Sequence, residues 1–161
     1  MKNDELINIL KLLVSASIDI VQDMADVSAK RGKVDKKFDS IVSSGISTVL
    51  GIYGQYKGRI IIDMDFPTAI ALAGKINEEN FSEVNETVLY TIMEVNNIIA
   101  GKVVSDANNI NKEYNFKITP PGIFSGEEVI ISSPNLQVYR IEISTEVGKY
   151  YVSIGFEGVD I

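Results

Sequence analysis

Hydrophobic residues recur at helical spacing in two long stretches of the chain. In residues 4–30 they form a stripe opposite acidic and amide residues, and it comprises Ile7, Leu10, Val14, Ile18, Val21 and Ala25. In residues 86–108 a second stripe comprises Val88, Ile92, Val95, Ile99 and Val103. Each pattern predicts an amphipathic helix. A shorter helix is predicted over residues 67–74, because proline suits the first turn of a helix and glycine its end.

Segments rich in branched residues predict β-strands on both sides of the second long helix. They cover residues 38–43, 46–53 and 59–64 before it, and residues 116–119, 128–132, 136–144 and 150–156 after it. This order of helices and strands is typical of an α+β domain. We therefore expect a single domain over residues 1–161, with its helices packed on one face of a mostly antiparallel sheet.

The second long helix presents a distinctive set of residues on the side away from its hydrophobic stripe. At about 100° per residue, the residues that point away from the stripe are Tyr90, Glu94, Asn97 and Gly101. A helix needs to bury only one stripe, so this face is free to contact a partner. Glycine costs about 1 kcal/mol relative to alanine inside a helix, which indicates that something packs close to Gly101. We expect Tyr90 and Gly101 to contact a partner.

Composition excludes several kinds of chemistry. The chain contains no cysteine and no histidine, which rules out disulfides, Cys/His zinc sites and Ser-His or Cys-His relays. The net charge of −7 disfavours binding to nucleic acid or to an anionic membrane. No signal peptide and no apolar run long enough to span a bilayer is evident, so we expect a cytoplasmic protein.

One basic cluster stands out against this negative charge. It comprises Lys30, Arg31, Lys33, Lys36 and Lys37, and Gly32 lies within it. Cations stabilise the carboxyl end of a helix, and glycine suits the cap that follows. We interpret the basic cluster as the end of the first helix and its exit loop.

An amide and a carboxylate on one helix face have a coherent chemical use. The amide of Asn97 offers two N–H donors and one acceptor, so it could hold a water in a fixed direction without titrating. Positioning a water for in-line attack is a central task in phosphoryl hydrolysis. Glu94 could pair with a lysine of a partner. On spacing alone a solvated helix face is the more ordinary interpretation, since the same spacing recurs at Glu5 and Asn8.

Two segments resemble one known family. Residues 94–101, Glu-Val-Asn-Asn-Ile-Ile-Ala-Gly, are similar to the E-x-x-N-M-I-A-G helix of the CheX branch of the CheC/CheX/FliY superfamily, bacterial phosphatases of the chemotaxis response regulator. Residues 118–126 resemble the I-x-x-P-x-x-x-x-G segment that follows that helix. The order of elements also matches, so the resemblance covers nearly the whole chain. Ile98 replaces the usual Met, and Asn96 adds a second amide with no evident role.

The resemblance implies a function and a partner. The chain would dephosphorylate a phosphorylated CheY-like receiver domain, with Asn97 orienting the water and Glu94 pairing with the receiver's lysine. It would need no cofactor or metal of its own, because the receiver brings the phosphoaspartate and Mg²⁺. The family also associates by continuing a sheet between subunits. We expect such a homodimer here, formed by residues 136–144 or 150–156.

Three alternatives remain open. The same fold could be a non-catalytic module that binds a receiver or another signalling partner through the same helix. Asp63 and Asp65 could bind Mg²⁺ at a strand end and support a metal-dependent hydrolase, although no third acidic ligand is near them in sequence. Glu5 and Asn8 could be the remnant of a second E-x-x-N motif, which family members with two active helices carry.

Overall fold

Residues 1–159 are described by the structure, a computed structural model of the chain. They form three α-helices, one short 3-10 helix (η1) and seven β-strands. The elements are α1 (Asn3–Ala25), β1 (Ala29–Val42), β2 (Gly45–Tyr53), β3 (Gly58–Asp65), α2 (Phe66–Asn77), α3 (Glu86–Ile110), η1 (Lys112–Tyr114), β4 (Lys117–Ile118), β5 (Gly122–Ser125), β6 (Ile130–Thr145) and β7 (Gly148–Phe156). Within residues 1–159, none of the helices combines the length and the apolar character needed to cross a membrane.

All of these strands belong to one antiparallel sheet. Its order is β1-β6-β7-β3-β2-β4, and β5 also pairs with β2. One edge is therefore β1, and β4 and β5 share the other. The two strands predicted over residues 128–132 and 136–144 are parts of the single strand β6. The strand β5 was not predicted.

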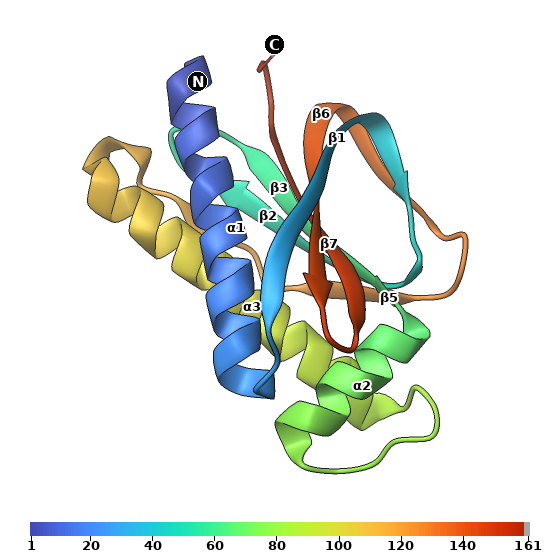
Figure 1. Cartoon of the computed structure of the whole chain (residues 1–161). Coiled ribbons are helices and arrows are strands. Elements are labelled where there is room, and N and C mark those ends of the chain that lie inside the picture. The colour runs from blue at the N-terminus through green and yellow to red at the C-terminus, as the bar shows by residue number, and fades with distance from the viewer. Residues whose placement is uncertain (160–161) are drawn as a thin grey trace.

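The three helices lie against one face of this sheet and enclose the main hydrophobic core (Figure 1). Side chains alternate along a strand, so Ile60 and Ile62 of β3 face the helices and are fully buried among their residues. Leu13 of α1 and Ile99 of α3 are fully buried in the same cluster. The predicted α+β class, with helices on one face of an antiparallel sheet, is confirmed.

A smaller hydrophobic cluster lies on the other face of the sheet. It consists of Ile41, Ile61, Ile131, Leu136 and Val138. Ile61 alternates with the core residues of β3 and so points away from the helices. The register of β1 and β6 shifts at Phe38/Asp39, where Asp39 has a φ of 59° and Asn135 a φ of 60°. Such an irregularity bends a strand pair, and the ends of β1 and β6 thereby contribute to this cluster.

α1 ends earlier than predicted. Asp26 is left-handed with a φ of 50°, and its backbone N–H donates to the carbonyl of Gln22, which closes the helix. β1 begins three residues later. The basic cluster therefore lies in an edge strand, and its interpretation as a helix end and exit loop is wrong.

The two strands named for a homodimer are interior strands. β6 pairs with β1 and β7, and β7 pairs with β3 and β6. Residues 139–144 of β6 and 150–154 of β7 are paired on both sides within the chain, so these stretches cannot continue the sheet into a second subunit. The dimer prediction is wrong in that form. In residues 1–159 the strands paired on one side only are β1, β4 and β5.

Candidate functional site

The helix α3 begins at a side-chain cap. The side chain of Asn85 accepts a hydrogen bond from the backbone N–H of Val88 at 3.0 Å, which satisfies one of the free donors at the helix start. From there α3 runs to Ile110 over the side of the sheet formed by β2, β4 and β5, and it contacts both α1 and α2 (Figure 1). Its buried face holds the predicted stripe, so the residues on the opposite face are directed outward.

The predicted site residues lie on this outward face of α3. Tyr90 is 66% exposed, Glu94 is exposed, and Asn97 and Gly101 are half-buried. Within residues 1–159, no hydrogen bond or ion pair uses the side chain of Glu94 or Asn97. Polar groups held on a rigid helix without internal partners are available to a ligand or a second protein.

Two hollows flank Tyr90. One, of about 420 Å³, lies beside Glu94 and contains Asn77 and Thr91. The amide of Asn77 donates to the hydroxyl of Thr91 at 2.7 Å, which ties the end of α2 to α3. The other hollow, of about 360 Å³, contains Met93 and Ile123. The face is thus a ridge formed by Tyr90 between two concave areas, a shape that a complementary protein surface can fill.

The second hollow places the segment over residues 118–126 against the part of α3 that precedes the motif over residues 94–101. Ile123 belongs to β5, in the segment over residues 118–126, and it lines the hollow with Tyr90 and Met93 of α3. The segment is anchored to β2 by strand pairing and by a hydrogen bond of 2.7 Å from the N–H of Gly126 to the carbonyl of Gly45. The tertiary structure thus brings this segment beside Tyr90, one of the predicted site residues.

The packing of residues 1–159 does not explain why position 101 is a glycine. Apart from the adjoining backbone of α3, a methyl group added at its Cα would meet no atom of residues 1–159 within 4 Å. Close packing against another part of residues 1–159 therefore does not require glycine at this position. The contact that sequence reasoning inferred for Gly101 remains a prediction about a partner.

Asn96 is a residue whose place sequence reasoning missed. Its side chain is buried, and its Nδ2 donates to Oγ1 of Thr48 in β2 at 2.9 Å. The buried residues of α3 include Ala100, Val104 and Ala107 in addition to the predicted stripe. At about 100° per residue, these three widen the buried face toward Asn96. Counting the alanines as core residues would have placed Asn96 near the middle of that face.

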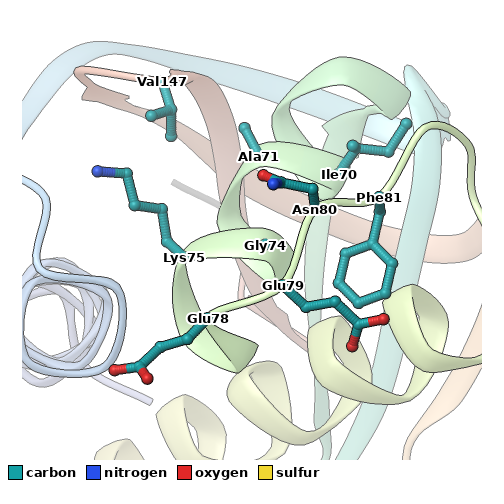
Figure 2. A pocket seen from close by; sticks show the side chains of 9 residues that line it. All are labelled: Ile70, Ala71, Gly74, Lys75, Glu78, Glu79, Asn80, Phe81 and Val147. Carbon is teal, nitrogen blue, oxygen red and sulfur yellow. The ribbon is translucent and has the colours of Figure 1, made fainter.

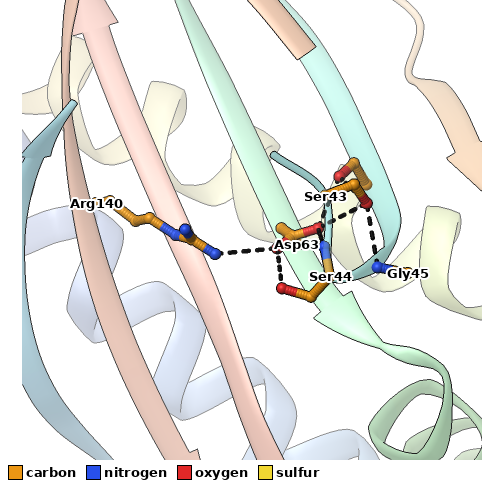
Figure 3. Close-up of polar contacts among 6 residues, drawn as sticks. Ser43, Ser44, Gly45, Asp63 and Arg140 are labelled. Carbon is orange, nitrogen blue, oxygen red and sulfur yellow. Dashed lines mark hydrogen bonds and ion pairs between the residues drawn. The ribbon is translucent and has the colours of Figure 1, made fainter. Parts of the chain in front are cut away.

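Asp63 is a buried hydrogen-bond acceptor in the structure. Its Oδ1 accepts from Oγ of Ser43 at 3.0 Å and from Oγ of Ser47 at 2.7 Å. Its Oδ2 accepts from Oγ of Ser44 at 2.8 Å and pairs with Nη2 of Arg140 at 3.1 Å (Figure 3). This network joins the β1–β2 turn to β3 and β6.

Asp65 has a separate role. It caps α2, because its Oδ1 accepts from the N–H of Thr68 at 2.8 Å. No group of three or more acidic side chains with metal-binding geometry exists in residues 1–159. The two carboxylates thus serve different structural ends, which removes the support for a metal-dependent hydrolase built on Asp63 and Asp65.

Glu5 is also engaged within the chain. Its Oε2 accepts from the backbone N–H of Lys2 at 2.6 Å, and the hydroxyls of Tyr56 and Tyr114 lie at 3.4 and 3.3 Å from its carboxylate oxygens. The Lys2 N–H, together with the two tyrosines, lowers the pKa of Glu5. Asn8 is exposed beside it. A carboxylate held in this way joins α1 to the β2–β3 turn and η1, so the interpretation as a remnant second site loses its support.

A larger hollow of about 500 Å³ lies over α2 and the loop that follows it (Figure 2). Gly74 forms part of its wall, and the side chains of Lys75, Phe81 and Val147 surround it. None of the predicted site residues contributes to this hollow. Its polar lining consists of Lys75, Glu78, Glu79 and Asn80. No described ion pair or side-chain hydrogen bond joins these four residues, and they form no constellation that suggests a reaction.

Comparisons with known proteins agree on one family. A family model described as chemotaxis phosphatase CheX matches residues 46–149. A chain in the crystal structure of the CheX–CheY–BeF3–Mg²⁺ complex from Borrelia burgdorferi is 31% identical, with a TM-score of 0.78 over 92% of this chain and 97% of that one. A comparison with curated proteins found no match.

Two further solved structures share the fold. The chemotaxis protein CheX from Desulfovibrio desulfuricans is 22% identical, with a TM-score of 0.83 over 93% of this chain and 99% of that chain. A CheC-like superfamily protein from Shewanella sp. PV-4 is 24% identical, with a TM-score of 0.83 over 98% of this chain and 100% of that chain. The chain thus shares with these proteins a fold class in which three helices pack against one antiparallel sheet. Within that class, the chain belongs to the CheX family of chemotaxis phosphatases.

Proposed function

We propose that the protein is a phosphatase that hydrolyses the phosphoaspartate of a CheY-like receiver domain. The observation that carries this proposal is the placement of Glu94 and Asn97 on the outward face of α3, inside the segment that matches the family model. Neither side chain has a hydrogen-bond or ion-pair partner among the residues that the structure describes. The relative from Borrelia burgdorferi was crystallised with CheY, BeF3 and Mg²⁺. This supports a phosphorylated receiver as the partner.

Asn97 is the residue that orients the attacking water in this proposal. Its amide can accept from the water and donate to a neighbouring oxygen without a change of protonation. The water oxygen forms a bond to phosphorus while the bond from phosphorus to the aspartate oxygen breaks, which yields inorganic phosphate and restores the receiver's carboxylate. The reaction needs positioning and charge neutralisation rather than a covalent intermediate on this chain. The receiver supplies the Mg²⁺.

Glu94 has the docking role. It lies one helical turn from Asn97 on the same face, beside the hollow that contains Asn77 and Thr91. A carboxylate there can pair with a lysine of the receiver, and loss of one member of such a desolvated pair costs about 2–5 kcal/mol. Glu94→Gln should therefore weaken the complex more than it lowers the maximal rate. A fall in maximal rate with unchanged binding would assign Glu94 a direct catalytic role.

The alternative is a CheX-fold module that binds a receiver without hydrolysing its phosphate. Both candidates use the same face, so binding alone does not separate them. The test is the decay of phosphorylated CheY-like receivers from the source organism and of CheY from Borrelia burgdorferi, with and without this protein. Acceleration of decay supports the phosphatase. Tight binding without acceleration for any receiver supports the module.

Asn97→Ala is the decisive variant for the catalytic residue. Loss of a catalytic hydrogen-bonding group costs about 10²–10³ in rate, whereas the half-exposed side chain contributes little to the fold. Asn109→Ala is the matched control, since Asn109 is an exposed amide on the same helix, more than three turns away. Hydrolysis at the wild-type rate by a folded Asn97→Ala variant would contradict the assignment.

We also propose that the protein acts as a cytoplasmic homodimer joined along β1. This edge strand has 14 residues. Beside it lies a hollow of about 580 Å³ between α1 and β6, with Ile7 at its wall 43% exposed and Val34 49% exposed. A second copy of the chain can pair with the backbone of this edge strand and can bury the adjoining apolar side chains. A dimer of this kind leaves the outward face of α3 to the receiver.

A further inference from the structure

One buried polar pair connects α3 to the sheet directly beneath the candidate site. Among the nine buried residues of α3, Asn96 is the only polar one. It is 1% exposed, and its partner Thr48 is 0% exposed. The Nδ2 of Asn96 donates to the Oγ1 of Thr48 at 2.9 Å. Asn96, the donor of this bond, immediately precedes Asn97 in the sequence.

Thr48 is a firm anchor for this bond. It lies in the middle of β2, where its backbone position is held on both sides, opposite Ile62 of β3 and Ile123 of β5. Its neighbours Ile46 and Leu50 face the same core and are fully buried. A hydroxyl on a central strand with packed neighbours has little freedom to move, so it defines a reference point for whatever binds it.

The rest of the buried face of α3 does not determine the rotation of the helix so sharply. Apart from Asn96 it consists of valine, isoleucine and alanine. Contacts between such side chains are non-directional and can be repacked at several helix rotations and axial positions. A buried hydrogen bond requires one geometry, because an unpaired donor away from water is costly. Single buried polar residues specify register in coiled coils for this reason.

We propose that Asn96 is a positioning residue, whose hydrogen bond to Thr48 sets the rotation and axial position of α3 and thereby directs Asn97 at the reacting phosphate. This inference rests on the proposed phosphatase function. Asn97 follows directly on the helix, and its short side chain moves with the backbone. Glu94 has a longer side chain, which can adjust to a small displacement. Loss of the bond should therefore lower kcat much more than it raises KM.

The test uses four variants and one control. Asn96→Leu and Thr48→Val each remove one partner of the bond, and the double variant removes both. Thr48→Ser keeps the hydroxyl. The control is Asn108→Ala on the same helix, since Asn108 exchanges hydrogen bonds of 2.9 and 2.8 Å with the backbone of Phe116, far along α3 from Asn97. Each protein is measured for Tm and for kcat and KM on phosphorylated CheY-like receivers.

Each single apolar variant should lose stability, because a buried partner remains unpaired; we expect Tm to fall by about 3–10 °C. The double variant should recover most of that loss, since apolar groups of similar shape replace both partners. Its kcat should nevertheless stay about tenfold to a hundredfold below wild type, the effect of a displacement of about 1 Å, with KM within about threefold. Thr48→Ser should keep kcat within about threefold of wild type.

Two results would overturn the inference while the wild-type protein is active. One is a double variant that regains wild-type kcat together with its Tm, which would show that the bond contributes only stability. The other is an equal fall of kcat in Asn108→Ala. If the wild-type protein accelerates the decay of no phosphorylated receiver, the proposed function fails, and the role of Asn96 in positioning fails with it.

Discussion

Gly101 allows the effects on stability and on partner binding to be separated in one substitution. It lies in the interior of α3, and a methyl group added at its Cα would meet no atom of the described residues within 4 Å beyond the adjoining helix backbone. Alanine is more favourable than glycine in a helix interior by about 1 kcal/mol. Gly101→Ala should therefore raise the free energy of unfolding by about that amount, and Tm by about 2–4 °C for a chain of this size.

The same substitution should impair the action on a receiver. Gly101 lies on the outward face of α3 with Glu94 and Asn97, so a partner that binds there approaches the helix backbone at Gly101. A methyl group forced into a well-packed contact costs about 1–3 kcal/mol, which corresponds to a KM raised about fivefold to a hundredfold. The maximal rate should change less, since Asn97 is left in place.

Thermal unfolding and the decay of a phosphorylated receiver measure the two effects. Asn109→Ala controls for added helix propensity, because it exchanges a poor helix former for a good one outside the proposed contact. Gly74→Ala is the opposite control, since a methyl group there would lie 2.9 Å from the carbonyl oxygen of Glu79 and should not stabilise. A Gly101→Ala protein that is less stable than wild type would refute the reasoning about free space. One that is more stable and has an unchanged KM would refute the partner contact.

Three further predictions concern the rest of the fold. Asp63→Ala should lower the free energy of unfolding in urea by about 3–5 kcal/mol, because the Asp63 side chain is 2% exposed and Arg140 would lose its ion pair; a loss below about 1 kcal/mol would contradict the network's role. The pKa of Glu5 is lowered from 4.5, mainly by the Lys2 N–H, so its stabilisation is present above pH 4.5 and is lost as the pH falls through the lowered pKa. Glu5→Gln should thus lose less stability than wild type between pH 6 and pH 3, and parallel curves would exclude this contribution. The β1 homodimer should dissociate when Val34 is replaced by lysine (Val34→Lys). It should tighten as salt is added, because salt screens the repulsion between the two copies of the basic cluster. Light scattering at low and high ionic strength tests both effects.

The pattern of hydrophobic residues predicted much of the fold. Helical periodicity located α1 and α3, and proline and glycine marked α2, because these signals act over a few residues. The end of α1 was misplaced because Asp26 adopts the left-handed conformation that glycine usually provides. The pairing of strands was beyond reach, since backbone hydrogen bonds between distant segments leave no local periodicity. That is why β6 and β7 were taken as edges although both lie inside the sheet.

For the candidate site, the sequence by itself determined that Glu94 and Asn97 share one face of an amphipathic helix, because that relation depends only on the helical repeat. Tertiary structure alone decided what surrounds that face: Ile123 comes to it from β5, Asn96 turns inward to Thr48, and Asp63 is enclosed by serines and Arg140. The hydrogen-bonded residues among them lie 16 to 77 positions apart in the sequence. Contacts of that range follow from how α3 and the strands pack around one core, and no window of neighbouring residues contains them.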